Sequence, residues 1–412
     1  MTSSQVTCQK TASRILAKLN AIYFYVAPYR LSCRNAFMEI SEANVDEWQK
    51  FFDERIKRSG PLVDGYLRYV SRISASGVPP LFELRHISKI LGIDEGLLVS
   101  MINRTDQFYR EFEIAKKRGG VRNIGVPSPT LLYVQRWILS EILSKMETHD
   151  AAHGYIAGRS VVSNANVHRS SRMILKMDLK EFFPSIKFKR VVKIFLSFGY
   201  PVGVSFFLAS FCCHKKKLPQ GAATSPTLSN LIAKRLDTSL CTYSQKRGLI
   251  YSRYADDLVF SGDRVGKEDI TQISFLIVRN GFEVNEKKTQ IIGENRKKIV
   301  TGVSISDGTL NLPRKTRREI QSHVYRLAKF GYMKFSEQSG VLDPMIYERV
   351  LGRIGFWLQI DPQNPTAHKL QSIMQQEISL NEHRFAGLFP SLPSVDSFAN
   401  SKGHRLEKRL PL

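Results

Sequence analysis

The stretch LIYSRYADDLVFSG, residues 249–262, is the most informative part of this sequence for its architecture. Two runs rich in aromatic and β-branched residues, Ile250–Tyr254 and Leu258–Ser261, favour strands, and Ala-Asp-Asp lies between them. Adjacent side chains of a straight strand point to opposite faces, so the neighbouring Asp256 and Asp257 can converge on one point only where the chain turns. The pattern therefore predicts a β-hairpin with both carboxylates at its tip.

Paired carboxylates at a hairpin tip have a chemical consequence. Two carboxylates held close together raise each other's pKa unless a cation neutralises them, so Asp256 and Asp257 between apolar strands indicate a divalent metal. An ordinary solvated turn is the alternative, because Asp is common in turns. A second acidic element favours the metal. The strand-like run Met173–Met177 ends at Asp178, whose carboxylate projects over the sheet edge, where a metal can bridge it to the hairpin.

The composition is that of a large, basic, folded protein. The 412 residues leave room for two or three domains, and 42% of them are hydrophobic. Lys and Arg number 61 against 37 Asp and Glu, a net charge of +24, which favours a polyanionic partner and nucleic acid first. No apolar run approaches the ~18 residues of a membrane-spanning helix. The 5 Cys form no CxxC pair and are odd in number, which fits a reducing cytoplasm.

Two further stretches combine turn residues with regular structure. Residues 109–127, YREFEIAKKRGGVRNIGVP, predict a β-hairpin with Gly119-Gly120 near its turn and Arg122 just before its second strand. Residues 218–237, LPQGAATSPTLSNLIAKRLD, predict a loop that leads into a helix, where Gly221 permits a close backbone approach and Pro226 suits the first turn. A solvated basic turn and a purely structural junction are the respective alternatives.

These stretches, in this order, resemble the sequence boxes of reverse transcriptases. YADD is similar to the catalytic Tyr-x-Asp-Asp of that family. HGYIAGRS at 153–160, PQG with the following SP and SN, and GFEVNEKKTQII at 281–292 resemble further boxes. NANVH at 164–168 and VTG at 300–302 resemble two short patterns of the retron branch of bacterial reverse transcriptases. The resemblance runs from about residue 80 to 360 and does not include the first 40 residues.

The resemblance implies an α+β fold with the right-hand architecture of polymerases. Such a fold has fingers, a palm with an antiparallel sheet and a helical thumb, and here a helical N-terminal extension precedes them. The expected segments are the extension at 1–75, fingers at 76–172 with a part from 188–217, palm at 173–305, thumb at 306–375 and a basic C-terminal tail at 376–412.

The resemblance also implies the site. Asp178, Asp256 and Asp257 are the expected catalytic residues and the ligands of two Mg²⁺ ions, with Asp178 and Asp256 as the principal ligands. Phe183, five residues after Asp178, matches the aromatic side chain that rejects a 2′-hydroxyl and so selects deoxynucleotides, and core packing is its alternative. The other expected nucleotide-binding residues are Lys117, Arg118, Arg122, Gln220, Gly221 and Lys288, and the expected RNA contacts are Arg159, Asn164, His168, Val300, Thr301 and Gly302.

The implied function is RNA-directed DNA synthesis of the retron type. The enzyme would use dNTPs to copy part of a cognate structured non-coding RNA into msDNA, a branched RNA–DNA hybrid primed from a 2′-hydroxyl of that RNA. The implied setting is antiphage defence in the cytoplasm, away from membranes, where the hybrid and enzyme restrain a toxic effector protein.

Three alternatives remain open. The first is another bacterial reverse transcriptase, either defence-associated or of the group II intron type. The second is a non-catalytic RNA-binding scaffold, against which the three acids and the PQG loop argue. The third is an RNA-directed RNA polymerase, which Phe183 disfavours.

Overall fold

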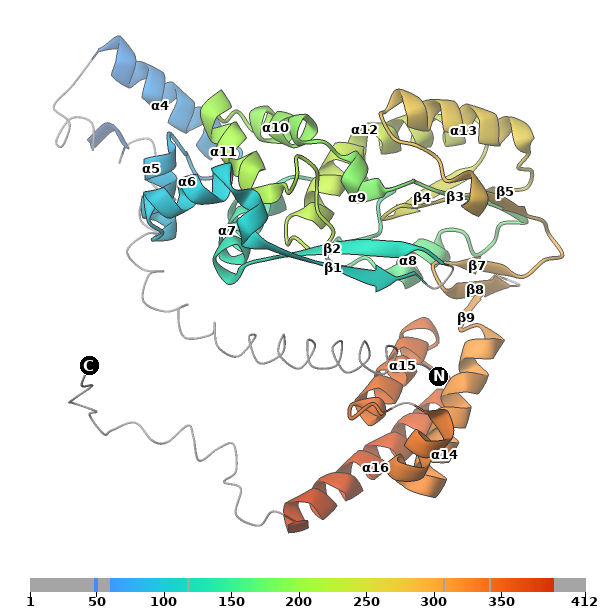
Figure 1. The fold of residues 1–412 in the computed structure, drawn as a ribbon. Coiled ribbons are helices and arrows are strands. Elements are labelled where there is room, and N and C mark those ends of the chain that lie inside the picture. The colour runs from blue at the N-terminus through green and yellow to red at the C-terminus, as the bar shows by residue number, and fades with distance from the viewer. Residues whose placement is uncertain (1–47, 51–59, 117–118, 307, 341, 389–412) are drawn as a thin grey trace, which may run out of the picture.

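The computed structural model describes residues 48–50, 60–116, 119–306, 308–340 and 342–388 (Figure 1). Lys117 and Arg118 therefore lie outside the described residues, as do most of the expected N-terminal extension and the end of the C-terminal tail. The extension is helical where it is described, at residues 48–50 and in α4 (Pro61–Ser74). Among the described helices, none combines the length and the hydropathy that crossing a bilayer requires.

A four-stranded antiparallel sheet forms the centre of the molecule. Its strand order is β4 (Ile250–Tyr254), β5 (Asp257–Gly262), β3 (Met173–Asp178) and β6 (Gln290–Ile292). The hairpin expected at 249–262 is β4–β5, and the strand expected before Asp178 is β3, which pairs directly with β5. Both sequence predictions of regular structure are confirmed.

The central sheet is buried on both faces. Leu258 and Phe260 of β5 belong to one hydrophobic core, and Val259 between them belongs to a second core. In Figure 1, α12 (Ser225–Lys246) and α13 (Lys267–Arg279) cover one face, and the short α8 (Val161–Asn166) lies on the other. Pro226 lies in the first turn of α12, as the sequence predicts. Because both faces are covered, Ser252, Arg253 and Ser261 are buried and need partners inside the protein.

A long two-stranded ribbon lies in front of the central sheet. It consists of β1 (Tyr109–Ala115) and β2 (Val121–Pro127), whose antiparallel register pairs Ile114 with Arg122. Gly119 and Gly120 have φ of 89° and 83°, as a tight turn requires. The predicted hairpin is confirmed, with one correction, because Arg122 is the second residue of β2 and does not precede the strand.

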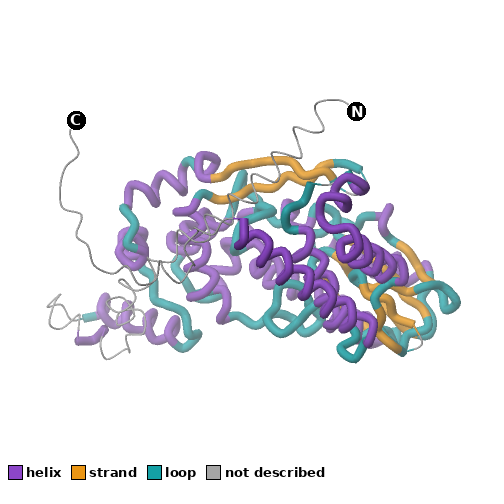
Figure 2. The backbone as a smooth tube through the Cα atoms, turned by 90° about the horizontal axis from the view of Figure 1, so that it is seen from below, coloured by secondary structure: helices purple, strands orange, loops and turns teal. Residues whose placement is uncertain are grey.

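Further helices contribute side chains to the same core as α12 and α13. Figure 2 shows the backbone with helices in purple and strands in orange. Asp94 caps α6 by accepting a hydrogen bond from Leu97 N, and Gly92 ends α5 in the left-handed conformation with a φ of 64°. These helices are α5 (Leu84–Leu91), α6 (Glu95–Asn103), α7 (Pro129–Glu141), α9 (Phe182–Ser185), α10 (Phe188–Ser197) and α11 (Val202–Cys212).

The C-terminal part of the chain forms a second unit around its own core. A three-stranded sheet of β7 (Lys298–Val300), β8 (Val303–Ser306) and β9 (Thr309–Asn311) leads into the helices. These helices are α14 (Arg314–Ser339), which kinks at Gly331, α15 (Ile346–Ile360) and α16 (Pro365–Leu388). Residue 375, where the thumb was expected to end, lies inside α16, so the chain has no break at that boundary.

Candidate active site

The tip of the β4–β5 hairpin contains only two residues. Tyr254 pairs with Asp257, so the connection is Ala255-Asp256, and Ala255 is left-handed with a φ of 57°. Asp256 lies at the tip as predicted. Asp257 does not, because it is the first residue of β5, and its partner across the other edge of the strand is Asp178 of β3. The expectation that both acids lie in the turn is corrected, yet the three acids still occupy adjacent positions.

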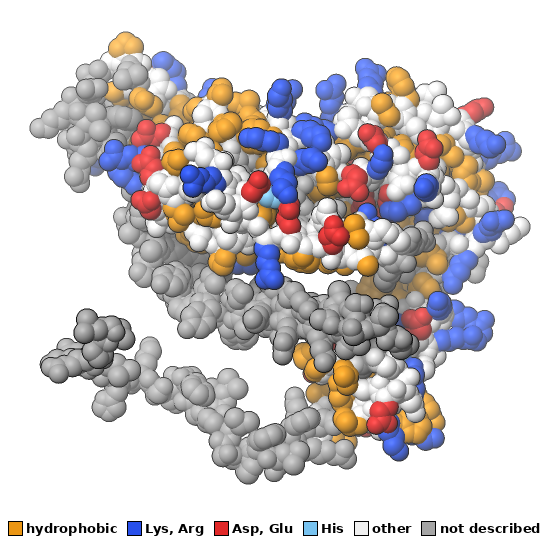
Figure 3. Space-filling model, in the orientation of Figure 1, with side chains coloured by type: hydrophobic (Ala, Val, Ile, Leu, Met, Phe, Trp, Pro, Cys, Tyr) orange, Lys and Arg blue, Asp and Glu red, His pale blue; other side chains and the backbone are white. Residues whose placement is uncertain are grey.

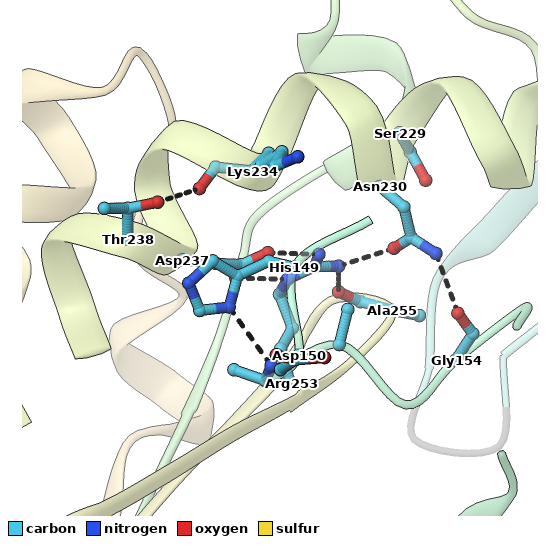
Figure 4. Close-up of polar contacts among 12 residues, drawn as sticks. His149, Asp150, Gly154, Ser229, Asn230, Lys234, Asp237, Thr238, Arg253 and Ala255 are labelled. Atoms are coloured by element: carbon cyan, nitrogen blue, oxygen red, sulfur yellow. Dashed lines mark hydrogen bonds and ion pairs between the residues drawn. The ribbon is translucent and has the colours of Figure 1, made fainter. Parts of the chain in front are cut away.

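A buried arginine holds the tip in place (Figure 4). The Arg253 side chain of β4 is 0% exposed and donates from Nη2 to Asp237 Oδ2 of α12 at 2.6 Å and from Nε to Asp237 Oδ1 at 2.7 Å. Its Nη1 donates to Asn230 Oδ1 at 3.0 Å and to Ala255 O at 3.1 Å. Because this guanidinium bonds the carbonyl of the left-handed Ala255, it fixes the turn that carries Asp256. Sequence reasoning did not single out Arg253 or Asp237.

A loop from residue 151 to 154 runs beside β4. Arg253 N donates to Ala151 O, and His153 N donates to Arg253 O, both at 2.7 Å. A Cβ at Gly154 would lie 2.8 Å from Ala255 N, so only glycine permits this approach to the hairpin tip. The Asn230 side chain donates to Gly154 O at 2.8 Å and thereby ties α12 to the same loop.

Asp178 is held by two side chains from the segment after α13. Its Oδ1 accepts from Asn285 Nδ2 at 3.0 Å, and its Oδ2 pairs with Lys288 Nζ at 2.6 Å. The peptide of Leu179 donates to Asp256 O at 2.9 Å, so the end of β3 is bonded directly to the tip of the hairpin. The sequence predicts Lys288 as a site residue, and the structure adds Asn285, which the sequence analysis does not name.

The carboxylates influence one another electrostatically. Burial and then the charge of Asp178 raise the pKa of Asp256, and burial, Asp256 and Asp178 raise the pKa of Asp257 to about 6. The cations Lys288 and Arg122 lower the pKa of Asp256. Three oxygen-donor side chains with this excess of negative charge fit a hard divalent cation. Among the described residues, no three His, Cys, Asp or Glu side chains are grouped as a metal cluster as they stand, and the oxygens of Asp178 are bonded to Asn285 and Lys288.

Aromatic side chains line the approach to the acids. Tyr155 lies with its ring centroid 6.1 Å from Phe183 and 6.5 Å from Tyr254, and burial and then the charge of Asp256 raise the pKa of Tyr155. The charge of Arg122, on the ribbon, lowers the pKa of both Tyr155 and Asp256. Phe183 is half-buried and packs on the core, so the site and packing interpretations both remain compatible with its position. Tyr155 was not predicted.

The PQG loop packs against the ribbon. Gly125 N donates to Gln220 O at 2.8 Å, and a Cβ at Gly221, whose φ is 125°, would lie 2.6 Å from Gly125 O. The close backbone approach expected at Gly221 is therefore made to β2. The side-chain Oε1 of Gln220 is buried without a hydrogen-bond partner.

Several of the expected RNA contacts are engaged inside the protein. Asn164, His168 and Val300 are each 0% exposed, so their side chains cannot touch RNA in this conformation. The Arg159 Nη1 donates to the carbonyls of Asp150 and Ala152 at 2.5 Å and 2.7 Å, and its Nη2 pairs with the Asp150 carboxylate at 3.0 Å. The sequence prediction of direct contact is thus corrected for Asn164, His168 and Val300, while Thr301 is half-buried and Gly302 is exposed.

Known proteins have similar sequences. A family described as reverse transcriptase (RNA-dependent DNA polymerase) matches residues 114–305. A retron reverse transcriptase from Escherichia coli, Ec86, is 34% identical over 71% of this chain and 89% of its own length. A second, Mx65 from Myxococcus xanthus, is 31% identical over 72% of this chain and 74% of its own length.

Among solved structures, a telomerase from Candida albicans in complex with a fragment of telomeric RNA matches with a TM-score of 0.39 and 12% identity over 74% of this chain and 68% of its own, too distant to carry an argument. The family match and the retron relatives are sufficient on their own. They confirm the expected α+β right-hand polymerase fold and the expected enzymatic activity, RNA-directed DNA polymerisation. With YADD on a hairpin beside Asp178 and relatives of this identity and coverage, the chain belongs to the retron reverse transcriptases.

Proposed function

We propose that this enzyme copies part of a cognate structured RNA into msDNA, with Asp178, Asp256 and Asp257 as its catalytic residues. The pairing of Asp178 with Asp257 across β3 and β5, next to the Asp256 tip, carries the proposal. Strands that are distant in sequence bring the three carboxylates to one end of the central sheet. A buried ion pair and a close-packed glycine fix the hairpin tip there.

The proposed cofactor is a pair of Mg²⁺ ions. Asp178 and Asp256 would be the principal ligands, and Asp257 would complete the set. When bound, such ions supply electrostatic stabilisation of the phosphates and lower the pKa of a coordinated hydroxyl. Lys288 would leave Asp178 Oδ2, where it now neutralises the carboxylate, and its ammonium would become free for a phosphate.

The described residues around the acids would position a dNTP. Arg122 on the ribbon would bind its phosphates, because this cation already acts on Asp256. Phe183, whose ring is near Tyr155, would lie under the sugar and exclude a 2′-hydroxyl. Gln220 presents a buried, unpaired Oε1 in the loop beside the ribbon, which suits a contact to the new base pair or to an ordered water.

A cationic pocket supports a nucleic-acid partner. It has a volume of about 540 Å³ and lies between the β6–β7 loop, β8, β9 and the first turns of α14. Arg317 Nε is buried there without a partner, and Glu294 is already paired with Arg172 at 2.9 Å. In Figure 3, Lys and Arg side chains gather beside the start of α14 at the right of the molecule. The basic residues that line the pocket are Arg296, Lys297, Lys298, Arg314 and Arg317.

The proposed division of the chain follows from this assignment. Fingers would comprise residues 76–172 and 188–217, the palm 173–187 and 218–305, and the thumb 306–388, so that α16 stays whole. The 2′-primed branched product, the antiphage role with an effector protein and the cytoplasmic location are part of the proposal, because they follow the retron branch.

Primer extension tests the proposed activity. Purified enzyme with Mg²⁺, an RNA template and a labelled primer should incorporate dNTPs in preference to NTPs. Asp256→Asn should abolish incorporation, while Asp263→Asn, the same change at an exposed site after β5, should leave it intact. Preferential NTP incorporation would identify an RNA polymerase instead. Tight RNA binding without any incorporation would identify a scaffold.

Sequencing of the copurified nucleic acid tests the retron product. One abundant RNA joined to cDNA through a 2′-linkage is expected, and its retention on the enzyme should depend on the catalytic Asp256. A heterogeneous RNA population with no linked DNA would overturn the proposal of msDNA synthesis while leaving the polymerase activity standing.

A further inference from the structure

The turn between β7 and β8 has an unfavourable residue in a demanding conformation. Val300 pairs with Val303, so the turn is Thr301-Gly302, and their φ values are 45° and 88°. Positive φ at both positions is the type I′ pattern, for which Asn-Gly and Gly-Gly are preferred. A β-branched residue at positive φ is a genuine outlier. Strain of this kind persists only where the surroundings hold it, and it concentrates at functional sites.

The Thr301 hydroxyl is bound to α8. Its Oγ1 donates to Val161 O at 3.1 Å and accepts from Asn164 Nδ2 at 3.4 Å. Asparagine or glycine at position 301 would suit the turn better but could not reproduce these two contacts. The Thr301 hydroxyl therefore connects the turn to α8, although threonine makes the turn itself more strained than asparagine or glycine would.

From α8 the hydrogen bonds continue to the catalytic hairpin. Asn164 Oδ1 accepts from Ser252 Oγ of β4 at 2.7 Å. A serine hydroxyl has one proton, and Ser252 donates it to Asn164. Ser252 must therefore accept the hydrogen bond from His168 Nε2, at 2.7 Å. Ser261 of β5 then donates to His168 Nδ1 at 2.6 Å, and Ser261 accepts from Ser171 at 2.8 Å.

The result is one head-to-tail chain of hydrogen bonds beneath the active site. It runs from Ser171 through Ser261, His168, Ser252, Asn164 and Thr301 to the carbonyl of Val161. Burial keeps His168 neutral, lowering its pKa to about 3, and only the neutral ring can both donate and accept. The hydrogen bonds include residues of both strands of the hairpin and reach the turn through Thr301, next to Gly302, which is exposed and has nothing within 4 Å of an added Cβ.

We propose that Thr301, Asn164 and His168 are positioning residues that hold the Thr301-Gly302 turn in register with the catalytic hairpin. The exposed backbone at Gly302 would contact the sugar-phosphate backbone of the template–primer duplex, so the network would set where the primer end lies relative to Asp256. This inference rests on the proposed function, and it gives the NANVH and VTG motifs one shared task. Neither motif then needs direct contact between its buried side chains and RNA.

Three substitutions at one position separate positioning from stability. Thr301→Asn improves the turn but loses the bond to Val161 O, and Thr301→Val keeps the shape but loses the hydroxyl. Both should lower kcat/KM for primed template by about tenfold, the effect of one hydrogen bond. The loss should lie mainly in KM for template–primer, with the KM for dNTP unchanged. Thr301→Ser restores the hydroxyl and should return kcat/KM to within about twofold of wild type.

Thermal unfolding of the same variants provides the control. Thr301→Asn should unfold at the wild-type temperature or above, because Asn suits a type I′ turn. A Thr301→Asn enzyme that is stable and fully active would overturn the inference, as would a Thr301→Ser enzyme as impaired as Thr301→Val. If the wild-type enzyme itself incorporates no dNTP, the proposed function fails, and that outcome is distinct from both.

Discussion

Arg253 and Asp237 form a wholly buried ion pair directly beneath the hairpin tip, with both side chains 0% exposed and Nη2 and Oδ2 2.6 Å apart. Tyr251 adds a hydrogen bond from its hydroxyl to Asp237 Oδ1 at 2.8 Å. The pair joins β4 to the middle of α12, and the same guanidinium reaches Ala255 O at the turn. The position of Asp256 therefore depends on a charge that has no access to water.

Arg253→Met should lower the free energy of unfolding by about 3–5 kcal/mol, because it leaves the Asp237 carboxylate buried and unpaired. Denaturant unfolding measures this loss. The double variant Arg253→Met with Asp237→Leu should recover much of the stability, since no charge then remains buried. It should not recover polymerisation, because Ala255 O still lacks its donor.

Exposure makes Arg172 and Glu294 the matched control for this pair. Their side chains are 61% and 53% exposed, and Nε and Oε1 lie 2.9 Å apart. Glu294→Gln should leave unfolding almost unchanged, as is usual for a solvated pair. Equal destabilisation by Glu294→Gln and Arg253→Met would show that burial is not what makes the Arg253 pair important.

Local patterns in the sequence predicted the elements that carry the acids. The alternation of strand-forming residues around YADD, the apolar run before Asp178 and the loop before Pro226 depend on neighbours in the chain, and the structure has β4–β5, β3 and α12 at these places. The one-residue error at Asp257 has a simple cause. Composition indicates a turn, whereas cross-strand pairing decides whether it contains two residues or three.

Tertiary burial explains the larger errors. Arg253 is followed by a pair of acids in the sequence, but its partner Asp237 comes from a helix that precedes the strand. His168 and Asn164 are polar residues in a motif, and nothing local shows that the sheet will cover them. One signal was available in advance. Thr-Gly at a two-residue turn contradicts the usual preference for Asn-Gly, and such a conflict indicates a residue kept for another purpose.

His168 should make the stability of this protein sensitive to acid. Burial lowers its folded-state pKa to about 3 from an ordinary value of 6.5, so the neutral ring stabilises the fold fully above about pH 6.5. As pH falls from 6.5 towards 3, His168 binds a proton in the unfolded chain but stays neutral in the folded protein, so the folded state loses stability relative to the unfolded state. Between pH 7 and pH 5 the loss should reach about 2 kcal/mol.

Denaturant unfolding at these two pH values checks the assignment. His168→Gln should be less stable at pH 7 but should lose less stability on going to pH 5 than the wild type loses. His368→Gln changes an exposed histidine of α16 and should keep the wild-type difference. A His168→Gln protein with an undiminished pH dependence would show that another group is responsible.

Lys288 should compete with metal for Asp178. Its ammonium lies 2.6 Å from Oδ2, so a divalent ion at this oxygen must displace it. Lys288→Met should therefore bind Mn²⁺, a probe for Mg²⁺, several-fold more tightly in calorimetric titration, since one competing cation is gone. Lys287→Met removes the exposed neighbour and should leave affinity near the wild-type value. Weaker binding by Lys288→Met would mean that the lysine supports the ion instead of competing with it.

The cationic pocket at the start of α14 should set the salt dependence of RNA binding. Arg314 and Arg317 line it, Arg317 Nε is buried without a partner, and no ion pair to either is found among the described residues. Each phosphate contact adds about 0.7–0.9 to the slope of log K against log salt. Arg314→Gln with Arg317→Gln should therefore reduce the slope by roughly 1.4–1.8, measured by filter binding across a salt series.

Arg279→Gln with Arg264→Gln provides the matched control for that pocket. Both arginines are exposed, one at the end of α13 and one in the loop before it, and the pair removes the same charge from the other side of the sheet. This variant should keep the wild-type slope. If the two pairs reduce the slope equally, RNA responds to the net charge of the protein and the pocket is not a specific phosphate site. If only the Arg314 and Arg317 substitutions reduce the slope, the pocket binds phosphate groups of the RNA, and the unpaired Arg317 Nε donates to one of them.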